Sequence, residues 1–147
     1  MRLHRYALPL GVLMLLALAG CRSTNAPPVP PVPRLAFTPE RAYPLGADSR
    51  RYVDALALRV NELRAYEVPV EVASEVEATM RSDRPGLWVR VLVFDGAGRF
   101  LGEELADSRA TVQWTAAPGR YRVEVENWGE QRIESGTLTI QLVEEDD

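Results

Sequence analysis

The segment LWVRVLVFDGAGRFL, residues 87 to 101, decides the fold class. Its first part, residues 87 to 94, is apolar at every position except Arg90. A short apolar run of this kind, rich in valine, is typical of a strand that is covered on both faces. The turn letters DGAG follow at residues 95–98, and residues 99 to 105 then return as a partner strand. The segment therefore predicts a β-hairpin whose first strand lies centrally in its sheet.

Four flanking stretches alternate between apolar and polar residues with a period of two. Their apolar positions are Tyr66, Val68, Val70 and Val72; Val76, Ala78 and Met80; Tyr121, Val123 and Val125; and Leu138, Ile140 and Leu142. This alternation predicts strands with one face in a core and the other in water. Pro69 interrupts the first of these stretches, which indicates an edge strand or a bulge, because proline has no amide hydrogen to donate.

Turn signals separate these stretches at regular intervals. The letters RPG at 84–86 precede the central strand, and APG at 117–119 precede the strand that contains Tyr121. Residues 53–64 fit either a strand or a short helix, and we expect a strand at their start. About eight short strands with such turns predict an all-β fold, a single antiparallel β-sandwich.

The same stretches resemble the bacterial pre-peptidase C-terminal domain over roughly residues 50 to 143. Asp95-Gly96 matches that family's turn after the central strand, and Gly119-Arg120-Tyr121 matches its Gly-x-Tyr strand. The resemblance implies a small jelly-roll-like sandwich that serves as a non-catalytic appendage. This chain departs from the family at residues 86–87 and 106–108, where the family often has acidic residues. We also expect no enzyme domain beside it.

The first 20 residues predict a secretory signal peptide. A short basic start precedes an apolar run from Ala7 to Ala19, which is shorter than the roughly 20 residues that a membrane-spanning helix needs. Residues 18–21, Leu-Ala-Gly-Cys, resemble the lipobox of bacterial lipoproteins. The resemblance implies cleavage before Cys21 and lipidation of its sulfur, and Arg22 in place of aspartate implies the outer membrane. An ordinary signal peptide and a buried structural cysteine are the alternatives.

A proline-rich tether is predicted between the anchor and the domain. Residues 21–48 contain the run PPVPPVP, which favours an extended polyproline II spacer. We expect Phe37 and Tyr43 to pack on the domain, which we assign to residues 49–147.

The composition excludes several classes of chemistry. The only histidine, His4, lies in the signal, and the only cysteine is Cys21. The mature chain therefore has no Ser-His-Asp triad, no Cys-His pair and no zinc site of the usual ligand type. The whole chain has a net charge of −4, which does not favour binding to nucleic acid. We predict no catalytic residue, no metal and no cofactor.

Acidic and aromatic residues are the remaining candidates for a site. We expect Glu103, Glu104, Asp107 and the tail 144–147 to be solvated, because no Asp-x-Asp-x-Asp-Gly calcium pattern is present. By strand parity, Trp114 and Tyr121 belong to the core. Trp128 shares the outward parity of its strand, so we predict it as an exposed binding residue, with a cap on the end of the sandwich as the alternative.

Together these features predict a membrane-anchored, non-catalytic lipoprotein of the cell envelope, facing the periplasm or the cell surface. Its sandwich would bind or scaffold an envelope protein or a glycan. A carbohydrate- or peptidoglycan-binding module that uses Trp128 is one alternative, and a small carboxylate-based hydrolase is another.

Overall fold

The structure is a computed structural model that describes residues 40–42 and 44–143. Within these residues the chain forms nine strands and no helix. The strands are β1 (Glu40–Arg41), β2 (Arg51–Leu58), β3 (Leu63–Val70), β4 (Ser74–Arg81), β5 (Trp88–Asp95), β6 (Phe100–Asp107), β7 (Arg109–Ala116), β8 (Gly119–Asn127) and β9 (Ile133–Leu142). No helix in the described part is long and apolar enough to cross a bilayer.

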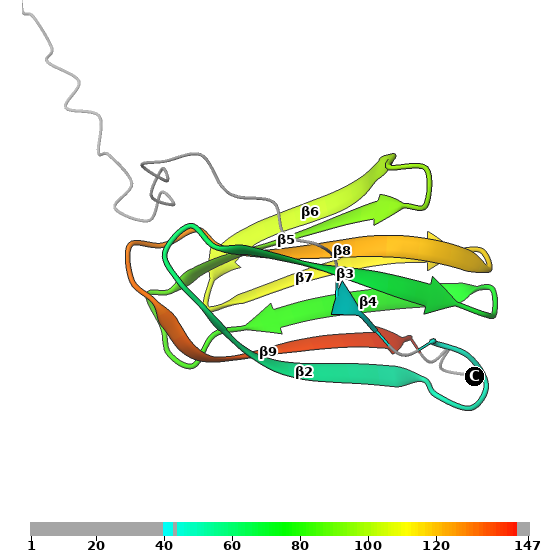
Figure 1. The fold of residues 1–147 in the computed structure, drawn as a ribbon, viewed down its shortest axis with the longest axis horizontal. Coiled ribbons are helices and arrows are strands. Elements are labelled where there is room, and N and C mark those ends of the chain that lie inside the picture. The colour runs from blue at the N-terminus through cyan, green and yellow to red at the C-terminus, as the bar shows by residue number, and fades with distance from the viewer. Residues whose placement is uncertain (1–39, 43, 144–147) are drawn as a thin grey trace, which may run out of the picture.

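Eight antiparallel strands form two sheets packed face to face, which confirms the predicted all-β sandwich (Figure 1). One sheet has the order β1-β3-β8-β5-β6, and the other has the order β2-β9-β4-β7. The short β1 adds to the first sheet in parallel, pairing Glu40 with Tyr66 and Arg41 with Glu67. Of the consecutive strands within residues 40–42 and 44–143, only β5 and β6 pair with each other, so each other connection between these strands carries the chain from one sheet to the other.

The inner faces of the two sheets form one hydrophobic core. On β5, Val89, Val91 and Val93 are each 0% exposed, and on the other sheet Met80 and Ile140 are equally buried. Alternate residues of each strand reach this core because strand side chains point to opposite faces in turn. The predicted inward positions on β4, β8 and β9 are therefore confirmed. Burial of this apolar surface is the main force that holds the two sheets together.

The outer face of β5 is only partly covered. Leu92 is buried, but Trp88, Arg90 and Phe94 are half-buried. The guanidinium carbon of Arg122 lies 4.6 Å from the centre of the Phe94 ring and shields part of it. We expected β5 to be covered on both faces, but only its inner face is fully covered. The reason is that the sandwich has two sheets, so no third layer packs on the outer face of β5.

The turn between β5 and β6 has the geometry that its sequence predicts. The Gly98 amide donates to the Asp95 carbonyl at 3.0 Å, and Gly98 has a φ of +80°, which glycine adopts without strain. A Cβ on Gly96 would lie 2.9 Å from the Arg120 carbonyl oxygen. Both glycines are therefore required, one for backbone conformation and the other for the close approach of β8.

Two expectations about β2 and β3 are resolved by the structure. Residues 53–58 continue β2, so the helical alternative for that region is wrong. Pro69 lies on β3, which is second in its sheet between β1 and β8 and pairs with β8 without a register shift, so the predicted edge strand or bulge is not found. The Pro69 carbonyl accepts from the Leu45 amide at 2.8 Å, so the backbone polar groups of this residue face Leu45, and proline costs no hydrogen bond to β8. Val72 is a correction: it lies beyond the end of β3 and is 38% exposed.

The sandwich begins earlier than the boundary expected at residue 49. Leu45 is fully buried in the core, and β1 extends the first sheet. Residues that we assigned to the tether therefore belong to the folded unit. The signal segment, Cys21, Phe37, Tyr43 and the tail 144–147 lie outside the described residues.

Candidate functional site

Trp128, the binding residue predicted from the sequence, lies at the end of β8 and is half-buried. Its amide donates to the carbonyl of Trp88 at 3.0 Å. The guanidinium carbon of Arg90 lies 4.9 Å from the centre of its indole ring. The side chain is therefore neither fully exposed nor part of the core, and the guanidinium of Arg90, on the neighbouring strand β5, lies over its ring.

Asn127 anchors the loop that carries Trp128, and the sequence analysis did not identify it. Its side chain is 0% exposed. Its amide nitrogen donates to the carbonyls of Gln131 at 2.7 Å and Leu58 at 3.2 Å, and its Oδ1 accepts from the Gly129 amide at 3.0 Å. A buried asparagine that satisfies three backbone groups fixes the position of its loop. The available signal was an asparagine directly before Trp-Gly, which is typical of turns.

Arg90 links Trp128 to two carboxylates and explains the single charge in the apolar run of β5. Its Nη2 lies 2.5 Å and its Nε 2.9 Å from Glu103 Oε2. Its Nη1 lies 3.5 Å from Oε2 of Glu126, which is only 4% exposed. We call Arg90, Glu103, Glu126 and Trp128 the Trp128 cluster. It presents a half-exposed aromatic ring within a charged network, an arrangement that suits binding.

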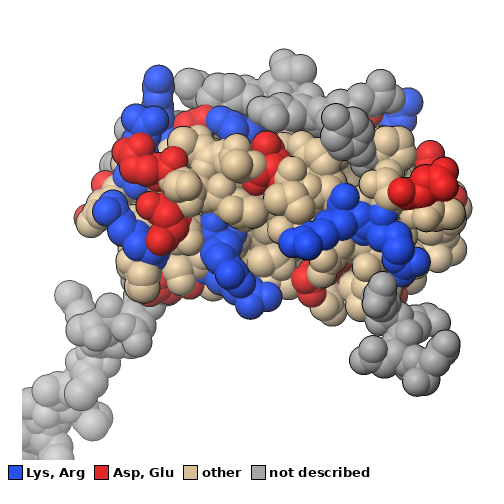
Figure 2. Space-filling model, turned by 90° about the horizontal axis from the view of Figure 1, so that it is seen from below, with Lys and Arg blue, Asp and Glu red and all other residues tan. Residues whose placement is uncertain are grey.

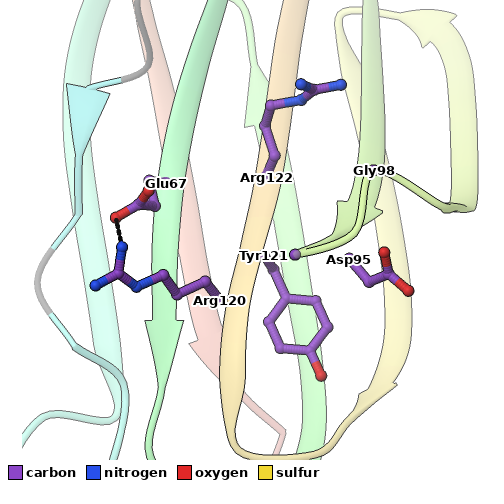
Figure 3. A pocket seen from close by; sticks show the side chains of 7 residues that line it. Glu67, Asp95, Gly98, Arg120, Tyr121 and Arg122 are labelled. Carbon is purple, nitrogen blue, oxygen red and sulfur yellow. Dashed lines mark ion pairs between the residues drawn. The ribbon is translucent and has the colours of Figure 1, made fainter.

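A second candidate is a groove of about 330 Å³ beside the β5–β6 turn (Figure 3). It is lined by Glu67, Asp95, Gly96, Gly98, Arg120, Tyr121 and Arg122. Figure 3 shows Arg120 extending across β3 toward Glu67, while Arg122 on the same strand extends toward the β5–β6 side. The Arg120 and Glu67 side chains form an exposed ion pair of 3.5 Å.

The Asp95 carboxylate in this groove is held in its charged form. Hydrogen bonding from the Arg99 backbone amide lowers the pKa of Asp95, partial burial opposes this, and the Ala97 amide and the Arg99 guanidinium lower it further. A carboxyl that acts as a general acid near neutral pH needs a raised pKa instead. The groove therefore presents mixed fixed charges and can bind polar groups, but Asp95 is unsuited to donating a proton.

The carboxylates singled out in the sequence do not converge on a site. Glu103 pairs with Arg90, and Glu104 accepts a hydrogen bond from the Thr111 amide. The Asp107 Oδ1 accepts from the Gly86 amide at 2.7 Å. Among the described residues no group of three or more acidic, histidine or cysteine side chains is arranged to hold a metal ion. These three carboxylates therefore hold strands and turns together.

The other two aromatic residues occupy the core as predicted. Trp114 is 6% exposed and Tyr121 is 9% exposed, and their ring centres lie 5.9 Å apart. The Tyr121 hydroxyl donates to the Ala117 carbonyl at 2.8 Å, so its polar end is satisfied at the end of the sandwich.

Charged side chains of both signs cover the exterior. On the face shown in Figure 2, several arginine side chains lie along the lower middle, and acidic side chains lie at both ends and also between the arginines.

Comparisons with known proteins identify similar folds. No family model matches the sequence, and no curated protein is similar to it. The pre-peptidase C-terminal domain of collagenase from Bacillus anthracis superimposes with a TM-score of 0.52 at 14% identity, covering 74% of this chain and all of that one. CorA, a surface-associated copper-binding protein of Methylomicrobium album BG8, gives a TM-score of 0.52 at 6% identity, covering 71% of this chain and all of that one. At these identities the likeness concerns the fold alone, and the expected fold of the pre-peptidase C-terminal domain is found.

Proposed function

We propose that this chain is a lipid-anchored, non-catalytic protein of the cell envelope that presents its β-sandwich as a binding or scaffolding module. The observation that carries the proposal is Cys21, which directly follows Leu18-Ala19-Gly20 at the end of an apolar run. A di- or triacylated cysteine anchors a protein stably, since each buried methylene contributes about 0.8 kcal/mol. Arg22 supports the outer membrane as its location, facing the periplasm or the cell surface.

Two features of the folded domain support a role in binding rather than catalysis. The described residues include neither histidine nor cysteine, so their chemistry rests on carboxylates, arginines and hydroxyls. Glu103, Glu104 and Asp107 are engaged in ion pairs or hydrogen bonds, and Asp95 has a lowered pKa. A carboxylate-based hydrolase would need one acid with a raised pKa beside an ionised partner.

The anchor is tested by membrane fractionation of cells that express the full chain. Cys21→Ser should move the protein from the membrane to the soluble envelope fraction and abolish incorporation of an alkyne-labelled fatty acid. The matched control is Ser23→Ala, which alters a neighbouring hydroxyl and should leave both readouts unchanged. An unchanged membrane fraction for Cys21→Ser would contradict lipid anchoring.

A glycan or peptidoglycan partner is the second candidate, and the half-exposed indole of Trp128 favours it. Aromatic rings that remain partly exposed contribute stacking surface for amphipathic ligands. Trp128→Ala should abolish retention of the protein on purified peptidoglycan, with folding verified by circular dichroism. The matched control is Phe100→Ala, because Phe100 is 52% exposed and lies on β6. Equal retention of wild type and Trp128→Ala would exclude this ring as the binding residue.

A further inference from the structure

The outer face of the four-stranded sheet carries two arginines directly opposite each other. The register of β4 and β7 pairs Arg81 with Arg109. Directly opposite residues on neighbouring strands have their Cβ atoms about 5 Å apart, and like charges in such positions destabilise the sheet. Within residues 40–42 and 44–143, neither guanidinium has a hydrogen-bonding or ion-pairing partner. The fold therefore keeps an unneutralised arginine pair at a site where a neutral residue would cost less.

These arginines line a groove of about 280 Å³ that runs across the sheet. The lining residues are Arg51, Glu77, Thr79, Arg81, Arg109, Thr137, Thr139 and Gln141. The register places Thr137 of β9 beside Arg81, and Thr139 beside Thr79. Arg109, Arg81 and Thr137 therefore lie side by side on β7, β4 and β9. Two residues along β4, Thr79 and Thr139 form the next pair, and the threonine hydroxyls can donate hydrogen bonds to the same ligand.

The groove has a positive charge because three arginines and one carboxylate line it, and that carboxylate hydrogen-bonds to neutral donors rather than to the arginines. Glu77 Oε2 accepts from the Gln113 amide at 2.8 Å, and Oε1 accepts from the Gln141 amide at 3.3 Å and the Thr79 hydroxyl at 3.4 Å. Since Glu77 has these neutral partners, Arg81 and Arg109 stay available to an anion.

A strained turn holds the two arginines in register. Ser108, directly before Arg109, has a φ of +60°, which is uncommon for a residue other than glycine. Its carbonyl accepts from the amide of Ser82 at 2.8 Å and from the Ser82 hydroxyl at 3.3 Å. Ser82 directly follows Arg81, so these bonds join the ends of β4 and β7 beside the pair. Backbone strain and like-charge repulsion at one position are typical of a functional site.

We propose that this groove binds a tetrahedral oxyanion, a phosphate or sulfate group carried by the ligand. Arginine presents a planar fork of donors that matches such groups, and two opposed guanidinium groups can share one oxyanion. The bound anion would offset the repulsion between Arg81 and Arg109. Thr79, Thr137 and Thr139 would lie beside the rest of the ligand, to which the phosphate or sulfate group is attached. The proposal names a ligand class for the binding function proposed above, but it does not depend on lipidation of Cys21.

The test is calorimetric titration of the purified full chain in a neutral detergent, in a chloride buffer of constant ionic strength. The probes are methyl phosphate, inorganic sulfate, dimethyl phosphate and acetate. Methyl phosphate and sulfate should bind at least tenfold more tightly than acetate, because a planar carboxylate cannot bridge both arginines with three oxygens. Preference for methyl phosphate over dimethyl phosphate would support a phosphomonoester, as on a phosphorylated sugar. Equal binding would support a phosphodiester, as in a lipid headgroup.

Variants show whether the binding occurs in this groove. Arg81→Gln and Arg109→Gln should each weaken methyl phosphate binding about tenfold, the usual effect of losing one charged hydrogen-bonding partner. Arg132→Gln is the matched control, since Arg132 is also exposed and pairs with Glu134 away from the groove. Absence of binding by every tetrahedral probe, or equal losses in Arg132→Gln and Arg81→Gln, would overturn the proposal. Because purified protein is used, this outcome is separate from release of Cys21→Ser from membranes.

Discussion

Replacing Arg90 with methionine should destabilise the domain through the Trp128 cluster, while methionine retains the apolar stem of the side chain. Three interactions are lost together. The Glu103 pair contributes about 0.5 kcal/mol, because the Glu103 side chain is 46% exposed and water screens it. The pair with Glu126, whose side chain is 5% exposed, contributes about 1–2 kcal/mol. The contact of the guanidinium with the Trp128 ring adds about 0.5–1 kcal/mol.

Because one guanidinium makes all three contacts, their energies do not simply add, and we expect a total loss of about 2–3 kcal/mol. For a domain of this size that loss lowers the melting temperature by about 10 °C. Urea denaturation of the full chain, followed by tryptophan fluorescence and circular dichroism, measures the free energy of unfolding. Coincident transitions by the two probes establish that the measured unfolding is two-state.

A double-mutant cycle with Glu126→Gln separates the buried pair from the other two contacts. If Glu126 supplies the largest share, Arg90→Met should cost about 1 kcal/mol less in the Glu126→Gln background, since no buried carboxylate then loses its contact with Arg90. A loss below 0.5 kcal/mol for Arg90→Met, or the same loss in both backgrounds, would refute the assignment of Arg90 as the residue that holds the cluster together.

Three further predictions concern the core, the hairpin turn and the arginine pair. Val91→Ala should lower the free energy of unfolding by about 2 kcal/mol, because Val91 is 0% exposed in the core, whereas Val53→Ala at a 51% exposed position should change it by less than about 0.5 kcal/mol. Asp95→Ala should lower the melting temperature at pH 7, and this effect should shrink progressively as the pH falls below the ordinary aspartate pKa. The pKa of Asp95 is lowered on folding, so the stabilisation is present above the ordinary aspartate pKa of about 3.9 and disappears as pH falls through the folded value. Arg109→Gln should raise the free energy of unfolding by about 0.5 kcal/mol in low salt by removing cross-strand repulsion, and the gain should shrink in 1 M NaCl; a loss in low salt would contradict the unpaired state of this arginine.

Local patterns in the sequence predicted the buried faces of β3, β4, β7, β8 and β9, but β1 was not predicted, and the outer face of β5 is only partly covered. The glycine turn at residues 95–98 predicted the one pair of consecutive strands that are neighbours, β5 and β6. Parity placed Trp114 and Tyr121 in the core correctly. The end of β3 was misjudged because Val72 continues the alternation past the last residue that pairs with β8. Alternation of apolar and polar residues indicates which face of the sheet a side chain occupies. It does not indicate the residue at which a strand stops pairing with its neighbour.

The candidate sites depended on contacts that are distant in the sequence. Trp128 was identified by its parity, but its contact with Arg90 arises because β8 and β5 are neighbours. The arginine pair was not predicted at all. Arg81 and Arg109 belong to separate strands with the β5–β6 hairpin between them, and no local pattern indicates that β4 and β7 are partners.

The all-β class, the β5–β6 hairpin and the buried faces of most strands follow from local sequence patterns, because they depend on a period of two and on the backbone conformations that glycine permits. Only the tertiary structure decided which strands pair, that β1 joins an edge in parallel, and that two arginines stand opposite each other. The physical reason is that nearly every connection crosses between the sheets. Partner choice therefore depends on how the whole set of strands buries its apolar faces and satisfies its backbone groups together.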